Sequence, residues 1–312
     1  MIHPPKDGLN IDGLLLLNKQ PGITSFDSLA SVKKTFATGK VGHTGTLDKF
    51  ASGLLLVLVG RGVKLANLFA NCVKEYTATV FFGAETDTLD PEGEVIARGE
   101  IPSRQDLEAA LESFRGDILQ APPAYSAIHI DGRRAHELAR SGKEPEMKKR
   151  PCTVFELEIL SWTPPEAVIK TNVSAGTYIR SLARDIALAA ASRAHLLALK
   201  RTRVGAFRLE DAATETLCPL DMRLFDALSL PMFSIDGNDK KAVNGFFNGM
   251  PLEGLLAKGQ LRPPADFPHW DAHSAGAKSA SFAGVFAAPN RLLGVLECRS
   301  GKWQYSHVFR DN

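Results

Sequence analysis

The sequence of 312 residues is poor in cysteine and lacks long apolar runs. Its four cysteines lie far apart and form no C-x-x-C pair, so the sequence favours neither a zinc site nor a disulfide framework. No uncharged apolar run approaches the ~20 residues of a membrane span, and the amino terminus has no apolar signal core. These absences predict a protein of the reducing cytoplasm without a membrane segment.

The signatures of several common enzyme classes are also absent. The chain has no G-x-S-x-G elbow, no H-E-x-x-H, no P-loop and no G-x-G-x-x-G after a strand, which argues against serine hydrolases, zinc peptidases, nucleoside triphosphatases and dinucleotide enzymes. Residues 85–94 hold five carboxylates, but their spacing matches no calcium loop, so a solvated acidic connection is favoured over a metal site. These patterns therefore favour neither a metal site nor a dinucleotide-binding site.

Positive charge is concentrated locally, although the net charge is only +2. Residues 186–209 contain no acidic side chain, and a second concentration lies at residues 133–150. Such stripes can neutralise the phosphates of a nucleic acid, or they can be solvated helix faces. The basic residues of the first stripe are Arg193, Lys200, Arg201, Arg203 and Arg208.

The length favours two domains, because single cores stop growing near ~250–300 residues. After about Pro231 the sequence consists of short apolar segments separated by glycine, proline and charged residues. We therefore expect a main domain over 1–231 and a small β-rich domain over 232–312. Patterning predicts strands at 13–17, 54–59, 76–82, 154–160 and 168–174. It predicts helices over 24–36, over 133–140, after a capping box at Ser103, and after residue 178.

One glycine-rich stretch, residues 42–53, precedes a strand that reads as buried on both faces. It contains His43 and a single carboxylate, Asp48. An aspartate in such a loop is commonly a turn or cap residue. An ionised aspartate held by a cation such as Arg180 or Lys19 would instead be a competent nucleophile.

A series of short motifs runs through residues 13–210, beside the stretch around Asp48. They are Lys19 with Gly22, Thr24 and Ser25; Lys74-Glu75-Tyr76; Thr86-Asp87 with Asp90 and Gly93; Pro122-Pro123 with Tyr125-Ser126-Ala127; residues 176–182; and residues 199–202 with Gly205 and Phe207. In this order they resemble the motifs of the TruB family of tRNA pseudouridine synthases, and the stretch around Asp48 resembles the family's catalytic-aspartate motif. The tail is weakly similar to the PUA-type RNA-binding domain found in that family.

The resemblance implies an α+β fold, a pseudouridine synthase fold with a mixed, mostly antiparallel sheet flanked by helices and loops, plus a small C-terminal β-rich PUA-like domain. It implies that the T-loop uridine at tRNA position 55 is flipped out and isomerised to pseudouridine, without cofactor or metal. Asp48 matches the nucleophile, Tyr76 the tyrosine that stacks on the base and serves proton abstraction, and Arg180 the arginine paired with the aspartate.

The remaining roles implied by the resemblance concern substrate binding. His43 matches the histidine that wedges into the T-loop, Tyr178 and Leu199 match pocket positions, and Lys19 matches a lysine near the active site. Arg201 and Arg203 lie in the basic stripe and are expected to contact phosphates. The expected partner is the tRNA T-arm stem-loop, bound by a monomer that needs no protein partner.

Several residues depart from the family pattern. Lys49 follows the aspartate where the family usually has proline, and Gln20 separates Lys19 from the proline that normally follows it directly. His129 and His136 stand where lysine and tyrosine are usual, and Val173 and Ala175 replace a cysteine and a lysine. These departures leave Asp48, Tyr76 and Arg180 intact, so they concern substrate contacts more than chemistry.

Two other functions stay open at this point. The basic stripes and the tail also suit a protein that binds and remodels tRNA without chemistry. A synthase directed to its site by a guide RNA or by partner proteins, as in dyskerin-type relatives, would carry the same motifs. Activity of the isolated chain on a bare T-arm stem-loop separates the three.

Overall fold

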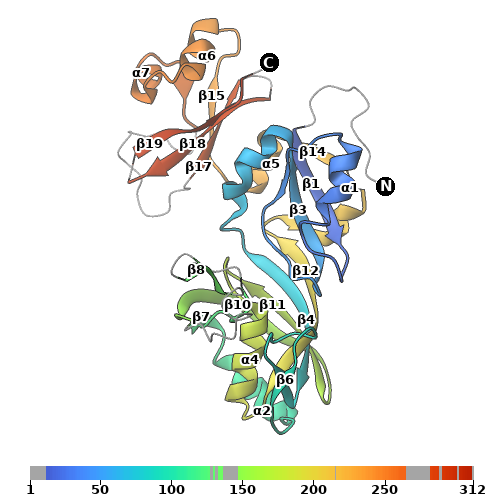
Figure 1. Cartoon of the computed structure of the whole chain (residues 1–312). Helices are drawn as coiled ribbons and strands as arrows, with labels where there is room; N and C mark the ends of the chain where they lie inside the picture. Colours follow the sequence, from blue (N-terminus) through green and yellow to red (C-terminus); the bar gives the residue numbers. More distant parts are fainter. Residues whose placement is uncertain are drawn as a thin grey trace.

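A computed structural model describes residues 12–126, 129–130, 133–135, 147–214, 216–264, 282–287, 290–300 and 302–310. Its main feature is a ten-stranded sheet with the order β14-β1-β3-β12-β4-β11-β10-β7, in which β13 pairs with β12 and β2 with β3 (Figure 1). The strands are β1 (Gly13–Lys19), β2 (Val41–His43), β3 (Ser52–Val59), β4 (Lys74–Phe82), β7 (Gly116–Gln120), β10 (Arg150–Thr163), β11 (Glu166–Val173), β12 (Ala194–Val204), β13 (Phe207–Arg208) and β14 (Leu217–Pro219).

Only the β12–β3 contact in this sheet is parallel; every other pairing between its strands is antiparallel. The α+β fold with a mixed, mostly antiparallel sheet is therefore confirmed. The five predicted strands are also confirmed: four are longer than predicted at one or both ends, and the fifth, predicted at 168–174, covers Glu166–Val173. Two separate hairpins complete this part of the chain: β5 (Ala84–Thr86) with β6 (Val95–Arg98), and β8 (His129–Ile130) with β9 (Arg133–Arg134).

Strand β12 joins the two halves of the sheet, since β3 lies on one side of it and β4 on the other (Figure 1). Arg201 is in register with Gly53, the last residue of the glycine-rich stretch 42–53 that carries Asp48 and is called the Asp48 loop below. Gly53 has φ +102°, and a Cβ added there would lie 2.3 Å from the carbonyl oxygen of Arg201. Only glycine permits both this conformation and this approach of the two backbones.

Helices cover each half of the sheet. In one half, α2 (Arg104–Glu112) and α4 (Ile179–Ala189) pack against β4, β10, β11 and β12 around one hydrophobic core. Helix α2 begins at the predicted capping box, where Ser103 Oγ accepts a hydrogen bond from the Asp106 amide at 3.1 Å. In the other half, α1 (Leu29–Thr35) covers β1 and β3, and the 3₁₀ segments η1 (Gly60–Phe69) and η2 (Leu209–Thr214) lie beside the same strands.

Two helix predictions need correction. Helix α1 begins at Leu29, because Thr24 Oγ1 accepts a hydrogen bond from the Asp27 amide and thereby closes a local turn instead of capping a helix. Arg133 and Arg134, predicted to start a basic helix, form strand β9. The Asp-Gly pair that precedes them in the sequence is the signature of a two-residue hairpin turn, which the helical prediction overlooked. The rest of that prediction, residues 136–140, lies outside the described residues.

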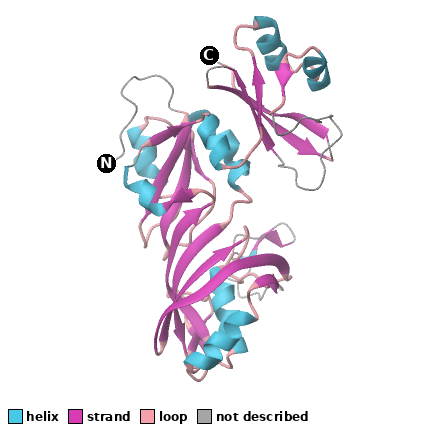
Figure 2. Cartoon of the chain, turned by 180° about the vertical axis from the view of Figure 1, so that it is seen from behind, coloured by secondary structure: helices cyan, strands magenta, loops and turns pink. Residues whose placement is uncertain are grey.

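A second sheet lies in the C-terminal part of the chain (Figure 2). It has five strands in the order β16-β15-β17-β18-β19. Its strands are β15 (Met232–Ile235), β16 (Leu261–Arg262), β17 (Phe282–Ala287), β18 (Arg291–Arg299) and β19 (Lys302–Val308), and its helices are α6 (Lys240–Phe247) and α7 (Leu252–Ala257). This is the expected β-rich C-terminal unit. The exact domain boundary at residue 231 stays a prediction.

The two parts of the molecule share one hydrophobic cluster. Phe225 on α5 (Met222–Ala227) packs edge-on against Phe286 on β17, with ring centroids 5.1 Å apart. Arg61 links the same parts: it pairs with Asp12 and donates a hydrogen bond to the carbonyl of Arg310 at 2.7 Å. None of the helices that the structure describes is sufficiently long and apolar to cross a membrane.

Candidate active site

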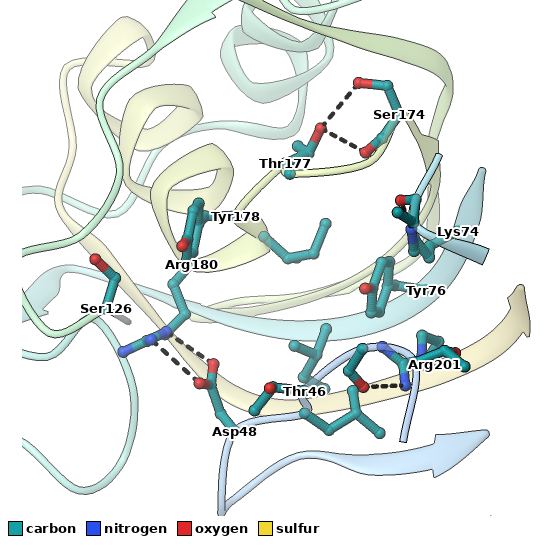
Figure 3. Close-up of a pocket in the computed structure, with 17 residues that line it drawn as sticks. Thr46, Asp48, Lys74, Tyr76, Ser126, Ser174, Thr177, Tyr178, Arg180 and Arg201 are labelled. Atoms are coloured by element: carbon teal, nitrogen blue, oxygen red, sulfur yellow. Dashed lines mark hydrogen bonds and ion pairs between the residues drawn. The ribbon is translucent and has the colours of Figure 1, made fainter. Parts of the chain in front are cut away.

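A pocket of about 440 Å³ lies where the two halves of the large sheet meet (Figure 3). It is lined by the loop of residues 44–48, by Lys74 and Tyr76 of β4, by Ser126, by residues 174 and 176–180, and by Leu199 and Arg201 of β12. Segments that are far apart in the sequence therefore supply one cavity. The structure brings together Asp48, Tyr76, Tyr178, Arg180, Leu199 and Arg201 from the predicted site.

Asp48 and Arg180 face each other across this pocket. Arg180 Nη2 donates a hydrogen bond to Asp48 Oδ1 at 3.3 Å, and Arg180 Nε lies 3.0 Å from Asp48 Oδ2. The Asp48 side chain is 39% exposed, whereas that of Arg180 is only 6% exposed. The carboxylate is thus open to a ligand on one side and held by a buried cation on the other (Figure 3).

Arg180 is itself fixed by further partners. Its Nη1 donates hydrogen bonds to Asp90 Oδ2 at 2.9 Å and to the carbonyl of Thr88 at 2.8 Å, and its Nη2 donates to the carbonyl of Tyr125 at 2.9 Å. The planar guanidinium can serve all of these acceptors at once, which a lysine ammonium could not do with the same geometry. Arg180 is therefore oriented before any ligand enters.

Enclosure changes the acid–base properties of the site. Burial raises the pKa of the Asp48 carboxyl, and the Arg180 guanidinium opposes that rise. Burial likewise raises the pKa of the Tyr178 hydroxyl. With its cationic neighbour in place, Asp48 has the charge partner that an ionised nucleophile needs in a desolvated pocket.

Tyr76, Tyr178 and Leu199 belong to the apolar part of the pocket lining, together with Leu47, Ala70 and Ile179. Tyr76 lies on β4 and is 8% exposed, and Leu199 on β12 is 6% exposed. Tyr178 precedes the first turn of α4; its amide donates to Gln120 Oε1 at 2.8 Å, and Gln120 Nε2 donates to its carbonyl at 3.1 Å. Gln120 thereby fixes the backbone of Tyr178, a contact that sequence reasoning missed.

Lys19 and Arg201 hold the backbone of the Asp48 loop. Lys19 is 1% exposed and donates hydrogen bonds to the carbonyls of Ala51 at 2.6 Å, Gln20 at 3.1 Å and Lys49 at 3.3 Å. Arg201 is 3% exposed and donates to the carbonyls of Leu54 at 2.7 Å and Gly45 at 3.1 Å. The structure therefore turns both cations toward protein carbonyls, although we expected Arg201 to face phosphates.

Two further predicted site residues, His43 and Arg203, lie outside the pocket lining, as does Lys49, which departs from the family pattern. His43 is on β2 and outside the pocket lining; its Nδ1 is buried without a hydrogen-bond partner among the described residues. Burial lowers the pKa of His43, which keeps the imidazole neutral at neutral pH. Arg203 is 31% exposed and pairs with Glu75 at 3.8 Å, and exposed Lys49 pairs with Glu92 at 3.7 Å.

Sequence reasoning gave Asp90 no role of its own. Asp90 lies in the acidic connection, is 4% exposed and accepts hydrogen bonds from Thr88 Oγ1 at 2.6 Å and from Arg180. The available signal was its place among the ordered motifs. In the part of the chain that the structure describes, this connection forms no cluster of three or more metal-ligating side chains.

The departures from the family pattern lie mostly away from Asp48. Val173 is buried in β11, and Ala175 lies in the turn before Gly176. His129 lies on β8, and His136 is outside the described residues. Lys49 extends its side chain into solvent, while its carbonyl accepts hydrogen bonds from Lys19 and from the Gly22 amide at 2.8 Å.

Solved structures share this fold across both parts of the chain. A structure titled "Structure of H/ACA RNP bound to a substrate RNA containing 2'-deoxyuridine" matches 96% of the chain and 85% of its own, with a TM-score of 0.66 and 21% identity. A second, titled "Crystal Structure of a Cbf5-Nop10-Gar1 Complex", matches 96% and 84%, with a TM-score of 0.64 and 22% identity. At this level of identity the likeness establishes the fold alone.

Sequence comparisons establish the family. The model of the TruB family pseudouridylate synthase (N terminal domain) matches residues 33–179. A tRNA pseudouridine synthase B of Borreliella burgdorferi is 45% identical over 247 residues, covering 78% of this chain and 86% of the relative. One of Francisella philomiragia is 45% identical over 210 residues, covering 66% and 70%. With such relatives and this fold, the chain belongs to the TruB family of tRNA pseudouridine synthases, which are isomerases.

Proposed function

We propose that this enzyme isomerises the uridine at position 55 in the T-loop of tRNA, with Asp48 as the nucleophile after base flipping. The observation that carries the proposal is the pairing of half-exposed Asp48 with buried Arg180 inside a pocket lined by aromatic residues. A uridine stacked in the T-loop cannot reach such a carboxylate until it leaves the stack. Tyr76 and Tyr178 can replace part of the lost stacking, which is worth ~1–3 kcal/mol per base.

In the proposed reaction the bond between uracil N1 and ribose C1′ breaks, the uracil turns over, and a bond forms between C5 and C1′. Asp48 attacks either the sugar or the uracil ring and is released at the end. The proton on C5 then leaves, a step that Tyr76 serves at the wall of the pocket, and N1 takes up a proton from solvent, so that substrate and product are isomers. Arg180 keeps Asp48 ionised and oriented throughout.

The proposal extends to the partner and the setting. We propose that the free chain binds the T-arm stem-loop as a monomer, with His43 at the edge of the site wedging into the loop and Arg203 and Lys200 facing phosphates. All four cysteines are free thiols, which fits a reducing cytoplasm.

The decisive experiment uses purified chain and a bare T-arm stem-loop. Wild-type protein is expected to convert the T-loop uridine to pseudouridine, and Asp48→Asn is expected to bind the RNA with unchanged affinity but to form no product. Tritium release from C5-labelled uridine measures turnover. Normal turnover by Asp48→Asn contradicts the nucleophile assignment. Faster tRNA folding without any product favours the remodelling function, and activity that requires an added guide or protein favours the guided one.

A further inference from the structure

The loop that carries Asp48 is held through its backbone by three buried side chains from outside the loop. Lys19 and Arg201 donate hydrogen bonds to carbonyls at its two ends, as described above. The third is Ser25, which lies in the turn before α1 and is 2% exposed. Its hydroxyl accepts a hydrogen bond from the Leu47 amide at 2.8 Å and donates one to the Leu47 carbonyl at 3.0 Å.

Of these contacts, that of Ser25 lies nearest to Asp48 along the chain, because it engages the amide and the carbonyl of Leu47. The Leu47 carbonyl belongs to the peptide that leads into Asp48, and both polar groups of Leu47 are satisfied by this one hydroxyl. Ser25 is absent from the pocket lining, so it has no route to a ligand except through the loop. The Leu47 side chain is buried in the main hydrophobic core, which gives the loop an apolar anchor at the same residue.

The geometry gives this contact a catalytic consequence. The segment from 44 to 51 has no strand or helix to fix its dihedral angles, so its shape depends on such side-chain contacts. A displacement of ~1 Å of a reacting group can cost ~10²-fold in rate. A loop that is shaped before RNA binding avoids that loss.

We propose that Ser25 is a positioning residue for Asp48, which holds the carboxylate toward Arg180 and the pocket by fixing the backbone of Leu47. The proposal rests on the proposed function of Asp48 as nucleophile. Lys19 and Arg201 secure the flanks of the same loop, but each is a buried cation whose removal would also disturb the sheet. Ser25 therefore isolates the positioning effect.

The test compares Ser25→Ala with Ser28→Ala. Ser28 is a buried serine of the same turn, and its hydroxyl donates to the Thr24 carbonyl at 2.9 Å without touching the loop. With saturating T-arm stem-loop, Ser25→Ala is expected to lower the single-turnover rate by about 10- to 100-fold. Its RNA affinity is expected to stay within about twofold of wild type. Ser28→Ala is expected to retain the wild-type rate.

A second variant protects the test against misfolding. Ser25→Cys keeps the size of the side chain but replaces the hydroxyl by a weakly hydrogen-bonding thiol. It is expected to remain folded and to show a reduced rate. The proposal is overturned if Ser25→Ala or Ser25→Cys turns over like Ser28→Ala, or if the rate falls only in proportion to RNA affinity. Asp48→Asn, assayed alongside, distinguishes failure of the positioning role from failure of the proposed function. If Asp48→Asn is inactive while Ser25→Ala has the wild-type rate, only the positioning role of Ser25 is wrong. If Asp48→Asn is active, the nucleophile assignment is wrong.

Discussion

Asp90 and Arg180 form a buried ion pair: each side chain is 6% exposed, and Arg180 Nη1 lies 2.9 Å from Asp90 Oδ2. The guanidinium reaches Asp48 with its remaining nitrogens. The position of the Arg180 guanidinium is thus set by a carboxylate that does not line the pocket itself.

Replacing Asp90 by asparagine is expected to weaken both stability and catalysis. Removing one charge of a buried ion pair typically destabilises a protein by about 3–5 kcal/mol, because the other charge is left without compensation. Thermal unfolding and single-turnover rates measure the two effects. Asp87→Asn is the control, since Asp87 lies in the same connection and accepts only the Glu94 amide among the hydrogen bonds described. Equal behaviour of the two variants would contradict this account.

As the pH is lowered, the wild-type enzyme is expected to lose activity at a higher pH than it would if Asp48 had the pKa of an ordinary aspartate. The ionised carboxylate is the proposed nucleophile, so activity is present above the Asp48 pKa and is lost as the pH falls through it. Burial raises that pKa, which places the acid limb of the profile of kcat/KM above about pH 3.9.

Arg180→Lys is expected to move this acid limb to still higher pH, because Arg180 is the neighbour that most strongly lowers the Asp48 pKa. The maximal rate should also fall, since lysine cannot serve the same acceptors. The pH profile of RNA turnover measures both. Arg184→Lys, on the same helix, should leave the limb in place; a limb that moves equally in both variants would exclude a specific effect of Arg180.

Adjacent basic residues on β12 should differ in their effect on RNA binding. Lys200 is exposed, whereas the Arg201 guanidinium is buried against loop carbonyls. Lys200→Ala is expected to flatten the salt dependence of tRNA affinity by about one phosphate contact. Arg201→Met should leave that slope unchanged while lowering turnover. Binding titrations over a range of salt concentrations measure the slope for each variant. A flatter slope for Arg201→Met would show that Arg201 contacts an RNA phosphate.

Gly53→Ala is expected to destabilise the protein strongly, because a Cβ there would collide with the Arg201 carbonyl oxygen. Gly22→Ala provides the comparison, since Gly22 also has a positive φ, +86°, but has open space where a Cβ would lie. Gly22→Ala should cost about 1 kcal/mol and Gly53→Ala several-fold more. Chemical denaturation measures the difference, and similar losses would mean that the close approach of β3 and β12 is unimportant.

Local patterns predicted the parts of the fold that depend on local chemistry. Alternation identified the strand of Tyr76, and the capping box at Ser103 identified the start of α2. Asp48, Tyr76 and Arg180 were grouped through motif resemblance, and they do line one pocket. Their catalytic roles remain proposals.

Long-range contacts explain what the sequence could not show. Asp90 matters because it holds the guanidinium of Arg180, which lies 90 residues further along the chain. Arg201 reads as a surface cation in a basic stripe, and only the pairing of β12 between β3 and β4 shows that it is buried. The Arg133–Arg134 strand, in contrast, had a local signal, the Asp-Gly pair before it, which the helical prediction overlooked.

The central place of β12 has a consequence during protein synthesis. The Asp48 loop leaves the ribosome early and Arg180 much later, and the strand that joins their two halves of the sheet ends only at Val204. A nascent chain that stops before this strand lacks two things: the hydrogen bond from Arg201 to the loop, and the pairing of β12 with β3 beside which the pocket lies. The pocket therefore cannot be completed until about two thirds of the chain has been translated.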